Sequence, residues 1–392
     1  MYDVIVVGAR CAGAPTAMLF ARAGYRVLML DRAEFPRDTL STLYIHQPGV
    51  ALLRRWGVLD KVIATGCPPV DRAVYEVADI RMEGCSVPVD GFRTAYAPRR
   101  HLLDAVLADA AVAAGAEFRQ GCAVDAVLSD GDRVAGVRYR TADGRHHEER
   151  ARLVVGADGM RSRFATLVDA EVMTEHPPLT CAYYTFYEPF TDRFELHQAP
   201  GRWVGTIPTN DATLVAAYFP QSEFERVRRD ATSAYREALR DTSPELFGRM
   251  EALTPLERLR GTGDQQNFFR EPVGPGWALV GDSGHHKDSI TARGITDAFR
   301  QAQLLVDTIG DGLEDPEELD QSLAEYADLR DEMLFDPYYA TLSVAELQVP
   351  ADRLDVLRVI AGSQELTDRY FGTLAGVLSV EELYSEDLLA LL

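Results

Sequence analysis

Residues 4–31 read VIVVGARCAGAPTAMLFARAGYRVLMLD, and this stretch decides the fold. The run Val4–Val7 is apolar without alternation and stops at a glycine, which is typical of a parallel strand buried on both faces. A helical apolar stripe begins at Gly13, and a second strand at residues 26–30 ends on Asp31. A strand, a helix and a strand within about thirty residues predict the β-α-β unit of a doubly wound sheet.

The turn after the first strand has the pattern G-x-G-x-x-G, with Arg10 in the second glycine position. Such glycines let the backbone approach a pyrophosphate, and an acid about twenty residues later accepts hydrogen bonds from ribose hydroxyls. Asp31 stands at that spacing from Gly8. The turn therefore predicts a dinucleotide site, with a tight turn of an ordinary α/β protein as the alternative. We expect Arg10 to contact a phosphate or else to point to solvent.

The remainder of the chain predicts one domain interrupted by insertions. Turn residues separate the strands of a β-meander, and aromatic and β-branched runs favour an antiparallel sheet. The expected elements are a helix near 100–114, a meander over 117–155, strands at 181–187, 203–207 and 214–219, a helical stretch near 222–240, a strand at 277–280 and a helix at 292–308. The residues after these are mostly helical and acidic.

The composition excludes several classes of protein. Forty Lys and Arg face 61 Asp and Glu, and a net charge of −21 repels phosphate backbones and anionic lipid. We therefore expect no nucleic-acid or membrane partner, and the absence of a basic leader favours the cytoplasm. Scattered cysteines, odd in number, predict neither a disulfide framework nor a zinc site. They are Cys11, Cys67, Cys85, Cys122 and Cys181.

Three later motifs narrow the choice of dinucleotide. Residues 100–107 fit R-x-x-L-D-x-x-L, and residues 156–162 fit G-A-D-G-x-x-S. Gly281-Asp282 ends a strand, and Gly294 precedes a helix. In this order the motifs resemble the flavoprotein monooxygenases of the para-hydroxybenzoate hydroxylase type, which are glutathione-reductase-like FAD proteins.

The resemblance implies an α/β fold in three parts. A discontinuous, doubly wound FAD-binding domain would comprise residues 1–72, 97–168 and 266–325. An inserted antiparallel-sheet substrate domain would comprise residues 73–96 and 169–265. A helical C-terminal region would complete the chain at residues 326–392.

The resemblance also implies contacts to FAD. The glycine turn would hold the pyrophosphate with Arg100 nearby, Asp31 the adenosine ribose, and Asp282 the ribityl chain. Asp158 would fix the loop that shapes the access of both the cofactor and the nicotinamide. Helix caps and turns are the alternative roles for Arg100, Asp158 and Asp282. The full expected set is Gly8, Arg10, Ala12, Gly13, Asp31, Arg32, Thr42, Arg100, Val124, Asp158, Gly281, Asp282, Gly294 and Ile295. Ser289 stands where the family often has proline beside the ring.

Four residues are candidates for catalysis. Arg37 is expected to offset negative charge on reduced flavin, and His46 to bind or deprotonate a substrate hydroxyl, with a helix cap as its alternative role. One of His285 and His286 is expected to face the cavity and move protons, while the other meets solvent. Their adjacency without a third ligand argues against a metal site. Aromatic residues of the substrate sheet are expected mainly as core, with pocket lining as the alternative: Tyr183, Tyr184, Phe186, Tyr187 and Trp203.

The implied function is an FAD-dependent monooxygenase. NADH or NADPH would reduce FAD, O₂ would add to the ring, and the flavin hydroperoxide would oxygenate an aromatic or polyketide-like small molecule in specialised metabolism. No second dinucleotide motif is visible, so the nicotinamide would dock transiently, or a separate flavin reductase would act. Either a monomer or a homodimer is expected.

Other functions remain alternatives. Flavin-dependent halogenases of this architecture carry W-x-W-x-I-P and an active-site lysine, whereas Gly205 replaces the second tryptophan here, and Lys61 and Lys287 lie outside the expected position. A double-bond reductase would consume nicotinamide without oxygen. A flavin-binding protein without turnover and a partner-dependent subunit are further alternatives, which an absence of bound FAD in the pure protein would favour. An NAD-dependent dehydrogenase would leave the motifs at Asp158 and Asp282 without a purpose.

Overall fold

The computed structural model describes residues 1–392. Its strands are β1 Tyr2–Val7, β2 Val27–Leu30, β3 Pro69–Val70, β4 Ala73–Val77, β5 Ile80–Gly84, β6 Ala95–Tyr96, β7 Glu117–Arg119, β8 Ala123–Asp130, β9 Arg133–Arg140, β10 His146–Gly156, β11 Val172–His176, β12 Thr180–Tyr187, β13 Phe194–Ala199, β14 Arg202–Thr209, β15 Ala212–Pro220, β16 Arg260–Thr262, β17 Asn267–Arg270, β18 Val273–Gly274, β19 Trp277–Leu279 and β20 His285–His286. Its α-helices are α1 Gly13–Arg22, α2 Gln47–Arg55, α3 Leu59–Ala64, α4 Arg100–Ala113, α5 Arg163–Leu167, α6 Phe224–Arg229, α7 Ala231–Thr242, α8 Pro244–Met250, α9 Gly294–Ile309, α10 Pro316–Ala345, α11 Ala351–Ala361, α12 Gln364–Ala375, α13 Val380–Leu383 and α14 Glu386–Leu389.

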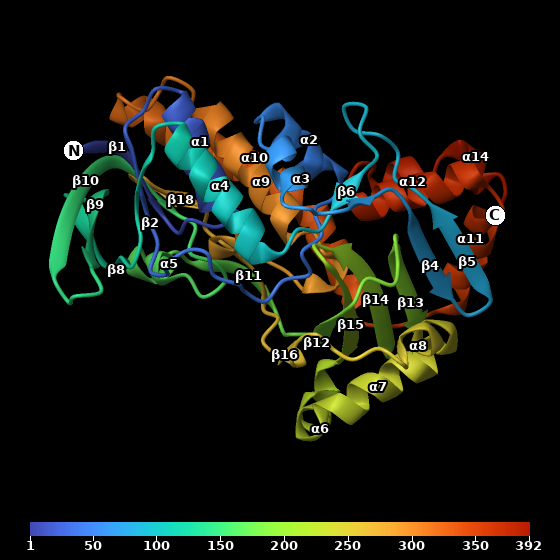
Figure 1. Ribbon diagram of the computed structural model, residues 1–392. Coiled ribbons are helices and arrows are strands. Elements are labelled where there is room, and N and C mark those ends of the chain that lie inside the picture. The colour runs from blue at the N-terminus through green and yellow to red at the C-terminus, as the bar shows by residue number, and fades with distance from the viewer.

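The first sheet has the order β18-β19-β10-β1-β2-β7 and is parallel from β19 to β7 (Figure 1). Val4 and Val6 pack on the core formed with α1, α4 and α9, whereas Ile5 and Val7 face the opposite core under β8, β9 and α5. Both faces are therefore covered, which is why the run shows no alternation.

The meander differs in one respect from its expected form. β8, β9 and β10 pair as antiparallel neighbours, but β7 is separate and pairs in parallel with β2. Gly121 adopts φ +65° between β7 and β8. This left-handed turn redirects the chain, because it uses a backbone conformation that glycine adopts readily.

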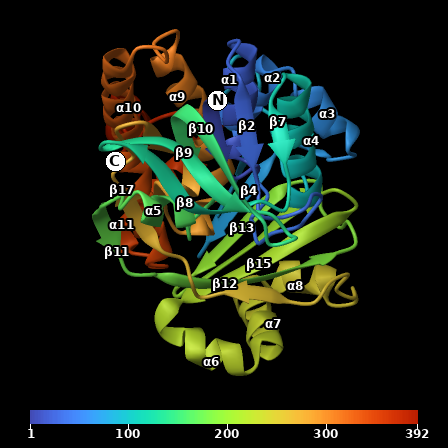
Figure 2. The same ribbon diagram turned by 90° about the vertical axis from the view of Figure 1, so that its left-hand side faces the viewer.

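The second sheet has the order β16-β12-β15-β14-β13-β4-β5 and is antiparallel except for the β13–β4 pair. One face packs on α7 and α8, which lie beneath it in Figure 2. The other face packs on α11, α12 and residues 290–292. The expected α/β architecture with an antiparallel sheet and a helical C-terminal region is confirmed.

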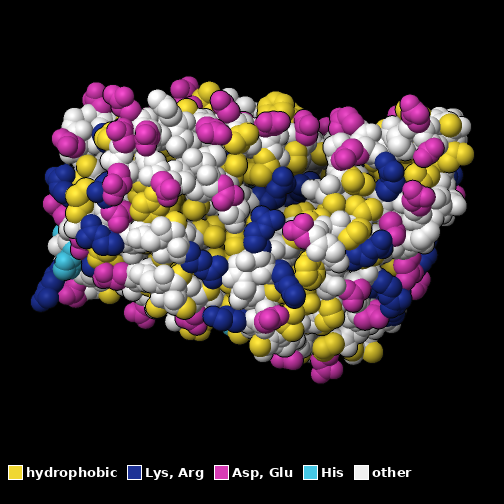
Figure 3. Space-filling model, turned by 90° about the horizontal axis from the view of Figure 1, so that it is seen from above, with side chains coloured by type: hydrophobic (Ala, Val, Ile, Leu, Met, Phe, Trp, Pro, Cys, Tyr) yellow, Lys and Arg dark blue, Asp and Glu magenta, His cyan; other side chains and the backbone are white.

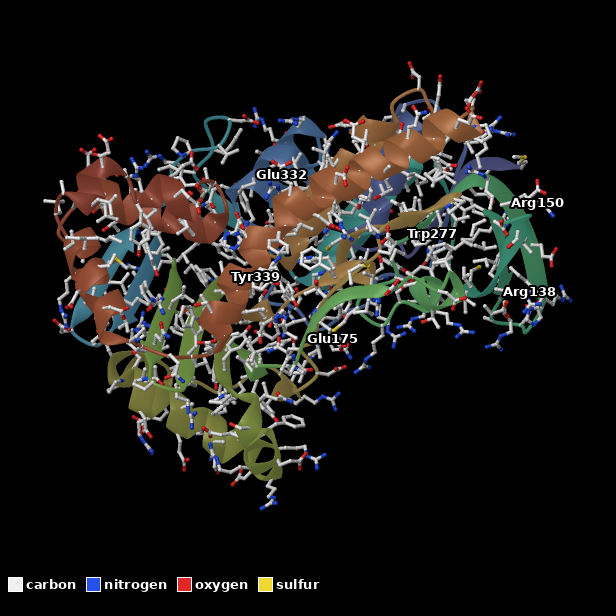
Figure 4. The ribbon with its side chains drawn as sticks, turned by 180° about the vertical axis from the view of Figure 1, so that it is seen from behind. Arg138, Arg150, Glu175, Trp277, Glu332 and Tyr339 are labelled. Carbon is white, nitrogen blue, oxygen red and sulfur yellow. The ribbon has the colours of Figure 1, made fainter.

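The C-terminal helices join the two sheets. α10 packs along α9, and α11 and α12 pack on β5. Figure 4 shows α10 crossing the back of the molecule, with Glu332 and Tyr339 on it and Glu175 on the neighbouring β11. None of the helices is both long enough and apolar enough to cross a membrane.

Candidate cofactor and active site

The turn between β1 and α1 is shaped for close approach of a ligand. Gly8 has φ +105°, and a Cβ there would clash with the Ala157 carbonyl. A Cβ on Gly13 would clash with the Gly8 carbonyl. No side chain caps α1 at Ala12, and no acid lies in its first turn. The partial positive charge of the helix N-terminus is therefore left for an anion.

Asp31 fixes this turn from the end of β2. Its buried carboxylate accepts hydrogen bonds from the backbone N–H groups of Ala9 at 2.9 Å and Ala33 at 2.8 Å. Each carboxylate oxygen can accept a further bond, so a ribose hydroxyl can still be held. Arg32, the next residue, is exposed, and Val124 is buried in β8.

The end of β19 meets the same turn. A Cβ on Gly281 would lie 2.7 Å from the Ala12 methyl group, so the two segments are in direct contact. Asp282 is partly exposed and accepts no hydrogen bond from the protein. Its charge acts on Arg100 and on Lys287, which places the Asp282 carboxylate near both. A free carboxylate beside the glycine turn is suited to hold hydroxyl groups of a ligand.

Asp104 ties the R-x-x-L-D segment to the glycine turn, a role that the sequence reasoning did not assign to it. Its fully buried carboxylate accepts from Arg10 at 2.9 Å, from the Cys11 thiol at 3.3 Å and from Arg100 at 3.1 Å. Arg100 keeps its charge despite burial because Asp104 is its partner. The presence of Asp104 in the R-x-x-L-D-x-x-L motif was the sequence feature that could have indicated this role.

Arg10 is bound to protein groups and only partly exposed to solvent. Its guanidinium pairs with Asp104 and donates to the Arg37 carbonyl at 3.4 Å, while a quarter of its side chain is exposed. A phosphate contact remains a prediction. Figure 3 shows Lys and Arg side chains gathered at a hollow near the middle of the upper face.

Asp158 serves its own loop. It accepts hydrogen bonds from Ser162 at 2.5 Å and from the backbone of Arg163 and Phe164 at 2.8 and 3.1 Å, so it caps the start of α5. The alternative for Asp158 was a turn residue before Gly159, and its role in cofactor and nicotinamide access stays a prediction. Asp158 holds the loop in place without requiring a ligand.

The N-terminus of α9 lies beside the loop that contains His46. Gly294 is exposed, Ile295 is buried, and the Thr296 hydroxyl accepts from the His46 backbone N–H at 3.0 Å. Ala292 adopts φ +54° just before the helix. No side chain caps α9, so its first N–H groups face outward from the helix end.

His46 is buried at the start of α2 but provides no side-chain cap. Its Nε2 lies 3.1 Å from the Thr291 carbonyl, which can only accept, so Nε2 carries the proton and Nδ1 has a free lone pair. Burial, followed by the charge of Arg293, lowers the pKa of His46 to about 4. The imidazole is therefore neutral at pH 7 and able to accept a proton.

The other candidate catalytic residues lie in different surroundings. His285 is buried against Phe269 and Tyr338, with ring centroids 4.4 and 5.8 Å away. Burial lowers its pKa well below the usual value. His286 bonds through Nδ1 to the Gln266 carbonyl.

Residues 37–42 form the loop that precedes His46. Arg37 is exposed, and Thr42 is partly buried. No three His, Cys, Asp or Glu side chains in the chain are grouped so that they could hold a metal ion.

These features fit FAD. The glycine cradle and the uncapped α1 suit a pyrophosphate, Asp31 and Asp282 present carboxylates, and the uncapped α9 faces the same region. The profile of the family described as FAD binding domain matches residues 1–331. The chain belongs to this FAD-binding family. It is accordingly an FAD-dependent oxidoreductase.

The flavoprotein has relatives with different reactions. A digeranylgeranylglycerophospholipid reductase of Methanopyrus kandleri is 26% identical over 386 residues, covering 94% of this chain and 96% of the reductase. The myxobacterial chondrochloren halogenase CndH matches with a TM-score of 0.79 and 22% identity over 99% of both chains. PqsL of Pseudomonas aeruginosa, a probable FAD-dependent monooxygenase, matches with a TM-score of 0.72 and 21% identity, covering 95% of this chain and 99% of PqsL. The structural likenesses show the shared fold of this flavoprotein.

Proposed function

We propose that the enzyme is a monooxygenase that transfers one atom of O₂ to an aromatic or polyketide-like small molecule, with NADH or NADPH as reductant. The observation that carries the proposal is the apolar, aromatic face of the second sheet, which packs on the loop leading to α9. In the cluster on this face, Ile290 and Ala292 from the loop are buried with residues of the sheet and of the segment before α2. The aromatic members from these parts are Tyr44, Tyr75, Phe186, Trp203 and Tyr218.

The apolar cluster beside the loop leading to α9 suits a reaction in which reduced FAD activates O₂. Bound FAD, once reduced, supplies the activation of O₂. Exclusion of water from the reacting region prevents loss of the oxidant to side reactions.

His46 is the group that we assign to proton transfer. Its Nε2–H is held by the Thr291 carbonyl, and Tyr44 packs edge-on at a centroid distance of 4.8 Å. The free Nδ1 is then fixed in direction. A substrate hydroxyl that reached Nδ1 would donate a hydrogen bond to an acceptor of constrained geometry and shift its proton toward His46 as it reacts.

Two features weigh against halogenation through a lysine. Lys61 is exposed on α3, and Lys287 is buried in an ion pair with Asp297, so neither ε-amino group is free at the aromatic face. A Cβ on Gly205 would lie 2.9 Å from the Glu195 carbonyl. The strand therefore excludes the second tryptophan of the halogenase motif.

A double-bond reductase is the second candidate, because the Methanopyrus reductase matches nearly the whole chain. The two functions differ in their use of oxygen. We would give FAD-loaded enzyme NADH or NADPH with a panel of phenols and polycyclic aromatics, and follow dissolved O₂ and product mass. A monooxygenase yields products heavier by one oxygen that carry ¹⁸O from ¹⁸O₂. Products heavier by two hydrogens, formed equally well without O₂, contradict the proposal.

The role of His46 in proton transfer is tested by a substitution at this residue. His46→Gln keeps a donor for the Thr291 carbonyl but cannot accept a proton, so we expect retained FAD and a fall in kcat of about a hundredfold or more, typical of a lost general base. His147→Gln, at an exposed site on β10, should leave kcat unchanged. If neither nicotinamide reduces the flavin, the same assay is repeated with a separate flavin reductase. An unchanged kcat in His46→Gln would remove His46 from the chemistry.

A further inference from the structure

Arg293 is a buried cation without a hydrogen-bond partner. It directly precedes α9, and only 8% of the residue is exposed. A methyl group placed on Gly376, at the end of α12, would collide with its guanidinium. The side chain is thus enclosed between the start of α9 and the C-terminal region, and its Nε has no partner.

The nearest carboxylate is shared. Asp297 Oδ1 lies 4.0 Å from Arg293 Nε, beyond hydrogen-bond distance, and Oδ1 has no partner either. The other oxygen, Oδ2, is taken by Lys287 in a close ion pair. Two buried cations therefore share one buried anion, because Lys287 and Asp297 are 7% and 2% exposed.

The neighbours do not remove the surplus charge. His46 is neutral at pH 7, and the partly buried Arg300 adds a further positive charge near Asp297. The partly exposed Asp282 acts on Lys287. Burial of an uncompensated charge is costly, and proteins normally satisfy such a group with a partner.

The end of α9 points to the nature of that partner. This helix has 16 residues and no side-chain cap, and Arg293 directly precedes it. Asp297 is the acid in its first turn, and the helix dipole attracts further negative charge at this end. Ile290 and Ala292, just before Arg293 in the chain, belong to the apolar cluster that also contains Tyr44. An anion attached to an apolar body would satisfy both parts.

We propose that Arg293 and the N-terminus of α9 form a binding site for an anionic group brought by a ligand. Two ligands could supply it: a carboxylate of the substrate, or the negatively charged pyrimidine ring of reduced flavin. Binding of a carboxylate to the oxidised enzyme needs no turnover. The proposal of an anion site can therefore be disproved while the proposed oxygenation stands, and the reverse also holds. It rests on the proposed function only for the identity of the substrate.

The first arm of the test uses oxidised, FAD-loaded enzyme with sodium benzoate and with benzamide, its neutral counterpart. We expect benzoate to perturb the visible flavin absorption with a Kd at least tenfold lower than benzamide. Arg293→Gln should lose this preference, since a charge-assisted hydrogen bond is removed. Arg300→Gln, which removes the same charge elsewhere on α9, should keep it.

The second arm measures the reduction potential of bound FAD without added ligand. If the reduced flavin is the anion, the enzyme binds reduced flavin more tightly than oxidised flavin because of Arg293. Arg293→Gln should weaken this preference about tenfold, which lowers the reduction potential by about 30 mV for a two-electron couple. Arg293→Lys keeps the charge and should shift the potential less. Equal binding of benzoate and benzamide by the wild-type enzyme rejects the substrate source even if the glutamine variant does not fold. An unchanged potential in Arg293→Lys and Arg293→Gln rejects the flavin source, and both rejections together overturn the site. Equal effects of Arg300→Gln also overturn it.

Discussion

At the scale of single residues, Gly13 makes the tightest backbone approach in the cofactor site. Its missing Cβ would overlap the Gly8 carbonyl, a backbone atom that cannot swing away. Gly13→Ala is therefore expected to cost about 1–3 kcal/mol of stability and to weaken FAD binding, because β1 and α1 must separate. Thermal unfolding and the flavin content of the purified variant measure both effects. Gly248→Ala is the matched control, since nothing lies within 4 Å of the added methyl group. A Gly13→Ala enzyme with full FAD content would contradict this account of the turn.

At the scale of an element, β13 carries a buried carboxylate that makes stability depend on pH. Burial would raise the pKa of Glu195, but hydrogen bonds from Arg249 and Thr191, with His197 Nε2 nearby at 3.7 Å, outweigh it and lower the pKa to about 2. The unfolded chain titrates near 4.5. The carboxylate thus stabilises the fold by about 3 kcal/mol above pH 4.5, and this contribution is lost as the pH falls toward 2.

Glu195→Gln tests that dependence in urea unfolding at several pH values. The free energy of unfolding should fall below the wild-type value at pH 7, and the difference should narrow between pH 5 and 3. Glu225→Gln, in an exposed pair with Arg228, should change little at any pH. A constant difference across the range would show that Glu195 is not ionised in the way described.

At the scale of the whole molecule, the cofactor site joins segments that are far apart in the chain. The turn after β1, the end of β2, the start of α4 and the end of β19 all meet there. FAD should therefore stabilise the entire fold in one step, by about 2.7 kcal/mol at a hundredfold excess over its Kd. Calorimetry of the FAD-free protein with and without added FAD measures the shift in Tm. Asp282→Ala should reduce the shift, and Asp241→Ala, at an exposed position on α7, should not. An unshifted Tm would mean that the assembled site does not bind FAD.

The sequence alone determined the local parts of this protein. Residues 4–31 predicted the β-α-β unit because strand, helix and glycine turn are encoded by short-range patterns. The acids Asp31 and Asp282 were placed at strand ends for the same reason. The antiparallel runs of the second sheet were visible as aromatic and β-branched stretches.

Only the tertiary structure decided which side chains meet. Asp104 gathers Arg10, Cys11 and Arg100, although more than ninety positions separate it from the glycine turn. Arg293 lies against Gly376 and shares Asp297 with Lys287, a surplus of buried charge that no spacing reveals. Short-range patterns specify backbone geometry, whereas burial and partnership depend on how distant segments pack. The charge environment of the site is therefore a property of the fold.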